Sequence, residues 1–178
     1  MSGTEQPLII YVADSSFFIE VHKRYPQKML PGIWKDLETL IHDGRIVAPV
    51  KVRDEINQQD DELKEWVNNH PALFKALGRE LLETTTFVVN KYPRTAKPSS
   101  QKPHHADPFV IGLAIKMRRT QPLSPREVVV VAEETSKLAS NPILREEEIE
   151  KIPDVCSRLG VPCIGHLEMF KREGFRFY

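Results

Sequence analysis

The fold is decided by an apolar run that stops at a carboxylate and then becomes amphipathic, Leu8-Ile9-Ile10-Tyr11-Val12-Ala13-Asp14-Ser15-Ser16-Phe17-Phe18-Ile19. A short continuous apolar run followed by Asp-Ser-Ser predicts a buried strand and then a helix with an N-cap. Asp14 would then lie at the carboxyl end of a central strand, which is the edge where open α/β sheets bind ligands. Asp is also among the commonest helix caps, so capping alone explains this residue equally well. The question is therefore whether other acids reach the same edge.

Length and composition indicate a globular protein of one domain. The chain has 178 residues, of which 40% are hydrophobic and 28% charged, values typical of a folded domain. Its 25 basic and 25 acidic residues cancel, so binding to nucleic acid would need a local basic patch. Cys156 and Cys163 lack the spacing of a zinc site and are expected to be reduced core thiols. Without a signal peptide or an apolar run of membrane length, we expect a cytoplasmic protein with no membrane partner.

Helical and strand patterns alternate along the chain, which predicts a parallel sheet with right-handed crossovers. Strands are expected at residues 8–13, 45–49, 127–132 and 161–164, with a β-prone run at 85–89. Helices are expected at residues 15–25, 31–44, 50–57, 60–70, 72–83, 152–160 and 166–173, and from Asp107 onward. We therefore expect a single domain over residues 1–178, of the α/β class: three α/β/α layers around a central, mostly parallel, twisted sheet of four or five strands.

Two polar segments interrupt this pattern. Residues 91–105 contain prolines, basic residues and histidines but no acid, which predicts a mobile basic loop. Four of its side chains are expected to contact nucleic-acid backbone, although a flexible surface linker is an equal alternative: Lys91, Arg94, Lys97 and Lys102. Residues 135–151 form a polar excursion in which residues 146–150 are expected to be a short helix.

Acidic residues occur where strands end or helices begin, at Asp14, Glu55, Asp107 and the pair Glu133-Glu134. Carboxylates brought together at one sheet edge repel each other unless a cation is present, and oxygen ligands favour Mg²⁺ or Mn²⁺. Two such ions, about 4 Å apart, can hydrolyse a phosphodiester bond without a Ser, Cys or His nucleophile. Each acid also has an ordinary interpretation: Asp107 could only cap its helix, Glu55 could be solvated, and Glu133 is expected to be the solvated neighbour of Glu134.

Six motifs occur in order along the chain: Tyr11–Ser16, Trp34–Leu37, Gly44–Pro49, Asp61–Trp66, Ala106–Ile111 and Lys151–Cys156. Together they resemble the PIN-domain nucleases over nearly the whole chain, and more narrowly an uncharacterised prokaryotic PIN-like family similar to VapC-like toxins. The resemblance implies a set of catalytic metal ligands, namely Asp14, Glu55, Asp107 and Glu134. It also implies Asp154 as a further ligand, with Ser15 and Glu133 in support. Ala132 stands where the family usually has threonine, so either glutamate can be the fourth acid.

The resemblance implies a Mg²⁺- or Mn²⁺-dependent endoribonuclease, with RNA as substrate and DNA as the alternative. It further implies the toxin of a toxin–antitoxin pair, with an antitoxin protein and a second copy of the chain as partners. A different interpretation is a nucleic-acid-binding or scaffold protein with a vestigial site. A dehalogenase-like phosphohydrolase is less well matched, because that class needs a second Asp where Ser16 stands.

Overall fold

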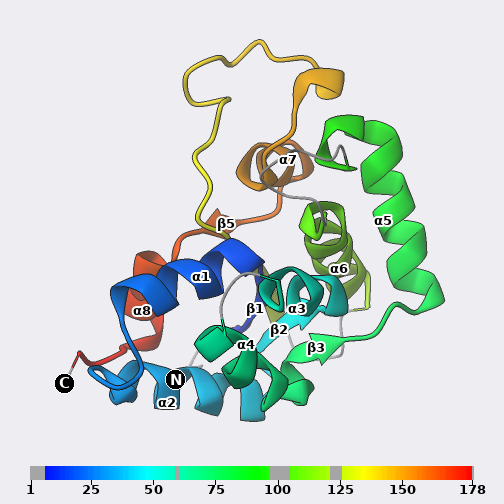
Figure 1. Cartoon of the computed structure of the whole chain (residues 1–178). Helices are drawn as coiled ribbons and strands as arrows, with labels where there is room; N and C mark the ends of the chain where they lie inside the picture. The colour runs from blue at the N-terminus through cyan, green and yellow to red at the C-terminus, as the bar shows by residue number, and fades with distance from the viewer. Residues whose placement is uncertain (1–6, 59–60, 97–104, 121–125, 178) are drawn as a thin grey trace, which may run out of the picture.

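The computed structural model of the chain describes residues 7–58, 61–96, 105–120 and 126–177 (Figure 1). In these residues five parallel strands form one sheet in the order β3-β2-β1-β4-β5. The strands are β1 (Leu8–Ala13), β2 (Ile46–Pro49), β3 (Phe74–Lys75), β4 (Arg126–Val131) and β5 (Cys163–Ile164). The predicted parallel α/β sheet is thereby confirmed.

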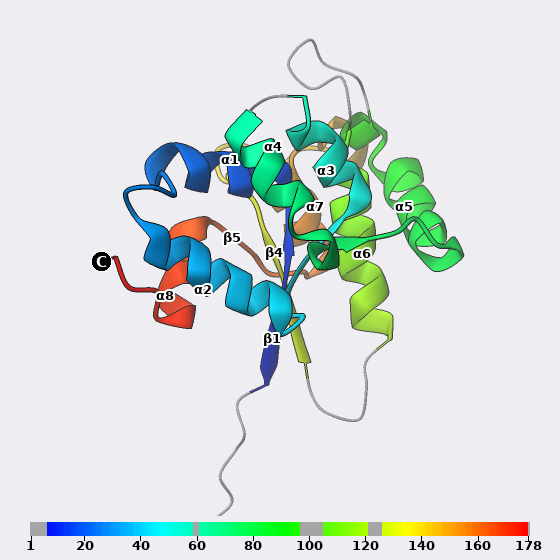
Figure 2. The ribbon, with the colours of Figure 1, turned by 60° about the horizontal axis from the view of Figure 1, so that its bottom comes forward.

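Helices cover both faces of the sheet. Their bounds are α1 (Ser15–Arg24), α2 (Pro31–His42), α3 (Val50–Ile56), α4 (Asp61–Asn68), α5 (Arg79–Lys91), α6 (Asp107–Arg119), α7 (Ile152–Leu159) and α8 (His166–Glu173). Short 3-10 turns are η1 (Pro71–Leu73), η2 (Pro93–Ala96) and η3 (Glu146–Glu148). Figure 2 shows α1, α2 and α8 on one face of the central strands and α5, α6 and α7 on the other. The fold therefore has the three α/β/α layers that the sequence predicted. None of the described helices has the length and apolar character that a membrane crossing requires.

The central strands β1 and β4 position the candidate site. Their residues pair in register from Leu8 with Arg126 to Ala13 with Val131. The valines of β4 from Val128 to Val131 are all buried, as expected for a strand covered on both faces. Asp14 continues the pairing, since its backbone N–H donates to the carbonyl of Val131 at 2.9 Å. Asp14 therefore lies at the carboxyl end of the central strand β1, beside that of β4.

The β-prone run at residues 85–89 is a helix, so that prediction was wrong. These residues belong to α5, in which Leu81, Thr85 and Val88 are buried at helical spacing. A Cβ atom on Gly112 of α6 would lie only 2.6 Å from Thr85 Oγ1, so the two helices pack closely at this point. Tertiary packing thus overrides the strand propensity of the β-branched residues. The helix predicted at residues 72–83 was also misplaced, because η1 and β3 precede α5.

The basic loop was predicted to begin too early. Lys91 ends α5, Arg94 lies in η2, and Tyr92 between them is buried, so residues 91–96 are ordered. The ammonium of Lys91 lies 3.4 Å from a carboxylate oxygen of Glu146 in η3, which brings this segment against the excursion. The predicted nucleic-acid contacts Lys97 and Lys102 lie outside the described residues. Figure 1 shows the excursion projecting from the body of the molecule above α7.

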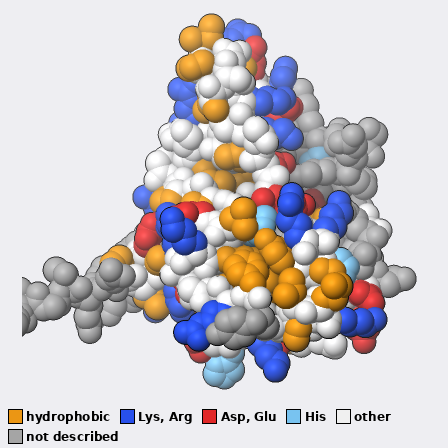
Figure 3. Space-filling model, turned by 90° about the vertical axis from the view of Figure 1, so that its left-hand side faces the viewer, with side chains coloured by type: hydrophobic (Ala, Val, Ile, Leu, Met, Phe, Trp, Pro, Cys, Tyr) orange, Lys and Arg blue, Asp and Glu red, His pale blue; other side chains and the backbone are white. Residues whose placement is uncertain are grey.

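The C-terminal segment packs on α8 and α1 through aromatic side chains. The rings of Phe170 and Phe175 stack with centroids 4.6 Å apart, and Tyr25 lies 5.7 Å from both Phe170 and Phe177. Figure 3 shows hydrophobic side chains gathered on this side of the molecule, where Leu167 and Phe177 are exposed.

The two cysteines are free thiols, as expected. Cys156 of α7 is buried and Cys163 of β5 is half-buried. A hydrogen bond with Cys163, together with burial, raises the pKa of the Cys156 thiol. Cys156 is therefore protonated at neutral pH and belongs to the core rather than to a reactive site.

Candidate functional site

Asp14 caps α1 with one oxygen of its buried carboxylate, and its other oxygen accepts no hydrogen bond from the described residues. Its Oδ2 atom accepts hydrogen bonds from the backbone N–H of Ser16 at 3.1 Å and from Ser16 Oγ at 2.6 Å. The residue is fully buried, and Asp14 Oδ1 has no hydrogen-bond partner in the part of the chain that the structure describes. The predicted cap is therefore present, but it uses one carboxylate oxygen and leaves the other available to a ligand.

Glu55 joins three distant segments at this edge. It is a buried residue of α3. Its Oε2 atom accepts a short hydrogen bond from Ser15 Oγ, and its Oε1 atom accepts the backbone N–H of Ala106 at 2.9 Å. Ser15 directly follows Asp14, and Ala106 directly precedes Asp107. The segments that carry Asp14, Glu55 and Asp107 are thus next to one another. Ser15 supports Glu55, although the resemblance suggested that it would support Asp14.

Asp107 does not cap α6, so that part of the prediction was wrong. The helix begins at Asp107 itself, and the N-cap residue is Ala106, which offers no side-chain cap. Asp107 is instead a buried carboxylate of the first helical turn. At this position its negative charge interacts favourably with the positive end of the helix dipole.

The two glutamates after β4 have different surroundings. Glu134 has only 8% of its side chain exposed; its Oε2 atom accepts the backbone N–H of Ile152 at 3.0 Å, and its Oε1 atom lies 3.7 Å from the ammonium of Lys151. Glu133 has 22% of its side chain exposed. Its backbone N–H donates to Ser16 Oγ at 3.0 Å, which links Glu133 to Asp14 through one serine hydroxyl.

Glu133 is held in place by a histidine that the sequence did not single out. Glu133 Oε1 accepts hydrogen bonds from both the backbone N–H and Nδ1 of His166, the latter at 2.9 Å. His166 is buried and its Nε2 lies 3.3 Å from the hydroxyl of Tyr25. The prediction that Glu133 is merely a solvated neighbour of Glu134 was therefore wrong. The only sequence signal for His166 is its place at the start of a helix directly after the last strand.

Asp154 stabilises the start of the excursion, residues 135–151, through hydrogen bonds. This fully buried carboxylate of α7 accepts hydrogen bonds from Ser136 Oγ, from the backbone N–H of Lys137 at 3.0 Å and from that of Leu138 at 3.1 Å. It does not cap α7, whose N-cap is Lys151. Its hydrogen bonds fix the conformation of the chain that follows β4, and its predicted role as a metal ligand stays a prediction.

The chemistry of the acids suits a hard cation. Their donor atoms are carboxylate oxygens, which Mg²⁺ and Mn²⁺ prefer, and Asp14 Oδ1 is a buried acceptor without a partner among the described residues. Across those residues, however, no group of three His, Cys, Asp or Glu side chains is arranged to hold a metal ion. A metal bound by these acids would therefore require their side chains to move from the positions described.

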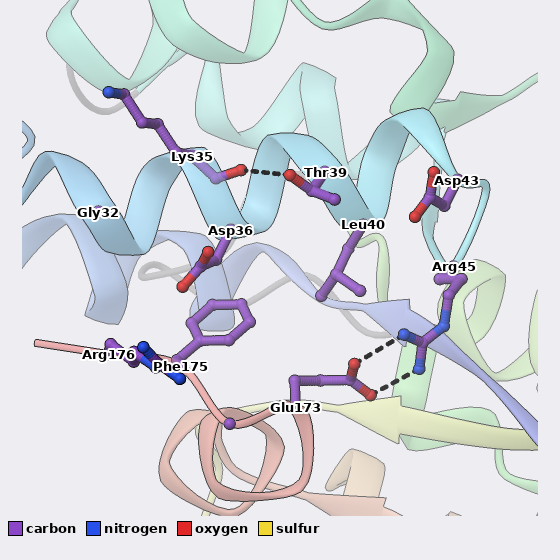
Figure 4. A pocket seen from close by; sticks show the side chains of 11 residues that line it. Gly32, Lys35, Asp36, Thr39, Leu40, Asp43, Arg45, Glu173, Phe175 and Arg176 are labelled. Carbon is purple, nitrogen blue, oxygen red and sulfur yellow. Dashed lines mark hydrogen bonds and ion pairs between the residues drawn. The ribbon is translucent and has the colours of Figure 1, made fainter.

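A hydrogen-bonded carboxylate far from the acids above lines a cavity of about 390 Å³ between α2 and the C-terminal segment (Figure 4). Both oxygens of Glu173 accept hydrogen bonds from the guanidinium of Arg45, at 2.6 and 2.7 Å. The hydroxyl of Tyr11 donates to Glu173 Oε1 at 2.7 Å. Burial and this hydrogen bond raise the pKa of Tyr11 well above its ordinary value, so the hydroxyl stays protonated and continues to donate.

Comparison with known proteins gives a family match. A family model described as Domain of unknown function (DUF4411) matches residues 11–177. No curated protein and no solved structure matches the chain.

Proposed function

Because the chain belongs to the family described as Domain of unknown function (DUF4411), we propose from its own side chains that it is a Mg²⁺- or Mn²⁺-dependent endoribonuclease. The main support is that Glu55 contacts both Ser15 and the backbone of Ala106, so the three segments that carry Asp14, Glu55 and Asp107 lie next to one another. Grouping carboxylates costs free energy unless a cation neutralises them. The resemblance of six motifs to PIN-domain nucleases supports the same conclusion, and VapC-like toxins supply the hypothesis of an antitoxin partner.

Asp14, Glu55 and Asp107 would hold the ion, with Glu134 or Glu133 as the fourth acid. A bound Mg²⁺ or Mn²⁺ supplies a water molecule of lowered pKa and polarises the phosphate. The neighbouring polar groups keep the carboxylates in position: Ser16 orients Asp14, while Ser15 and the backbone of Ala106 orient Glu55. Such hydrogen bonds from surrounding residues tune the affinity of a site for its metal.

A second candidate function is RNA binding without cleavage. It is favoured by one observation: across the described part of the chain, no three potential ligands are arranged to hold a metal ion. A protein with a vestigial site would keep the buried acids for their hydrogen bonds and would bind its partner through other surfaces.

A cleavage screen separates the two functions. The whole chain is incubated with tRNA, rRNA, mRNA and single-stranded DNA in Mg²⁺, in Mn²⁺ and in excess EDTA. We expect cleavage of RNA in either metal and none in EDTA. Asp14→Asn should abolish cleavage, and the matched surface variant Asp43→Asn, at the exposed end of α2, should retain it. Cleavage that persists in EDTA contradicts the metal mechanism, and RNA binding without cleavage in any metal selects the second function.

A further inference from the structure

A cavity of about 560 Å³ lies beside the acidic edge, where β4 passes into the excursion. We call it the excursion pocket. Besides Glu133 and Glu134, its lining includes the hydroxyl residues Ser16, Ser136 and Ser140 and the lysines Lys137 and Lys151. Ser16 connects the pocket to the acids, since its hydroxyl donates to Asp14 at 2.6 Å.

The wall of the pocket has a fixed conformation. Asp154 is fully buried beneath it and accepts hydrogen bonds from Ser136 Oγ and from the backbone N–H groups of Lys137 and Leu138. Three donors to one buried carboxylate hold this part of the backbone firmly. The side chains of Ser136 and Lys137 are therefore presented by an ordered turn, and a ligand would not have to order it.

The two lysines are available to an incoming anion. The side chain of Lys137 is 52% exposed and pairs with Glu150, whose pKa is lowered chiefly by this hydrogen bond. The side chain of Lys151 is 36% exposed and lies 3.7 Å from Glu134 Oε1. An exposed ion pair contributes little to stability, so a phosphate can replace Glu150 as the partner of Lys137.

The lining favours a sugar-phosphate backbone over a base. Among the described residues that line the excursion pocket, none is aromatic, so no base-stacking platform is present. Hydroxyl and ammonium groups are instead the donors that proteins direct to phosphate and ribose oxygens. The composition of the wall thus indicates which part of a nucleotide it contacts.

We propose that the excursion pocket binds the sugar-phosphate backbone of RNA next to the bond that the acidic edge would hydrolyse. Lys137 and Lys151 contact phosphates on this side, and the serine hydroxyls contact phosphate or ribose oxygens. This inference rests on the proposed function for the nature of the polymer. The sequence predicted contacts with nucleic-acid backbone only at residues 91–105, and the excursion pocket is a second place for such contacts.

Binding can be tested without catalysis, by fluorescence anisotropy of a short labelled single-stranded RNA with the whole chain in EDTA. The variant K137S/K151S removes both cations of the pocket. The matched control K35S/K171S makes the same change at two exposed lysines of α2 and α8. We expect K137S/K151S to bind roughly tenfold more weakly at low salt, and to reduce the slope of log affinity against log salt concentration by about 1.4, because each phosphate contact on a single strand contributes about 0.7. The control should bind like the parent.

The inference is overturned if K137S/K151S keeps the affinity and salt slope of the parent, if K35S/K171S weakens binding equally, or if the parent binds no RNA. Failure of the proposed function is observed separately, in the cleavage screen. A parent that never cleaves but loses RNA binding in K137S/K151S refutes the nuclease and upholds the pocket. A parent that cleaves, with unchanged RNA binding in K137S/K151S, refutes the pocket and upholds the nuclease.

Discussion

Two carboxylates near opposite ends of the central strands, one fully buried and one with 10% of its side chain exposed, are stabilised in different ways. Glu173 makes a bidentate ion pair with Arg45 (Figure 4), near the amino ends of β1 and β2, and it also accepts a hydrogen bond from Tyr11. The carboxylate of Asp14, at the carboxyl end of β1, accepts hydrogen bonds only from Ser16 among the described residues, and its Oδ1 atom has no hydrogen-bond partner there. The chain neutralises the first charge itself and holds the second with neutral donors.

We therefore expect the carboxylate of Glu173 to stabilise the fold, and that of Asp14 to contribute little to its stability. A buried ion pair with full hydrogen bonding is costly to break, because removal of one partner leaves an uncompensated charge. A carboxylate held only by neutral donors gains free energy when an external cation binds. Functional sites commonly keep charged groups whose burial lowers the stability of the fold. The comparison predicts opposite effects of mutation at the two ends of the sheet.

The largest effect is expected for Asp14→Asn in the cleavage assay. Loss of this charge should reduce the metal-dependent rate about 10³-fold, the scale seen when one electrostatic group is removed from an active site. Asn caps a helix nearly as well as Asp, so the free energy of unfolding without metal should stay within about 1 kcal/mol of the parent. Initial rates with Mn²⁺ and melting curves in EDTA measure the two quantities. A variant that keeps a tenth of the rate would remove Asp14 from the site.

Arg45→Met should show the reverse pattern. It leaves the largely covered carboxylate of Glu173 without its cation and should lower the free energy of unfolding by about 3 kcal/mol. The double variant R45M/E173L removes both charges and should recover most of this loss. Urea denaturation midpoints measure both changes, and the cleavage rate per folded molecule should remain that of the parent. A single variant as stable as the parent would show that the ion pair does not stabilise the fold.

Asp154→Asn should have an intermediate effect and tests whether burial alone distinguishes the two ends. Asp154 is as buried as Asp14 but accepts three hydrogen bonds. The amide group of Asn would present a donor to another donor, the backbone N–H of Lys137, at a cost of about 2 kcal/mol. The urea midpoint should therefore fall, although the same substitution at Asp14 leaves it nearly unchanged. Equal midpoints for the two variants would contradict the distinction.

The central strands and Asp14 could be predicted because their signals are local. An apolar run that ends at Asp-Ser-Ser specifies a strand and a capped helix without reference to the rest of the chain, and the valines of β4 specify a strand buried on both faces. Residues 85–89 were wrongly predicted to favour a strand, because intrinsic propensity takes no account of the close packing of Thr85 against Gly112. The two-residue strand β3 is too short to leave a pattern.

The partners of the acids could not be predicted, because they come from distant parts of the chain. Glu55 contacts Ser15 and Ala106 from 40 and 51 residues away, and His166 reaches Glu133 across 33 residues. Resemblance to a family predicted which acids belong together, which stays a prediction, and it did not indicate which donors orient them. For Asp107, the expected cap failed because the helix begins at that residue and the backbone N–H of the preceding Ala106 donates to Glu55.

The smallest effect on stability is expected for Asp107→Asn, and it decides whether Asp107 belongs with Asp14. Removing its charge from the first turn of α6 loses a favourable interaction with the helix dipole, worth about 0.5 kcal/mol, and gains a similar amount from weaker repulsion by Asp14 and Glu55. The melting temperature without metal should therefore stay close to that of the parent.

The matched control is Glu80→Gln, which makes the same change in the first turn of α5 at an exposed residue. A ligand stabilises a protein in proportion to its affinity for the native state. Asp107→Asn should therefore lose most of the rise in melting temperature that Mn²⁺ gives the parent, whereas Glu80→Gln should keep it. If Asp107→Asn retains the full Mn²⁺ shift, or melts several degrees lower without metal, Asp107 is a stabilising charge like Glu173, and the acidic edge consists of Asp14 and Glu55 with one of the glutamates after β4.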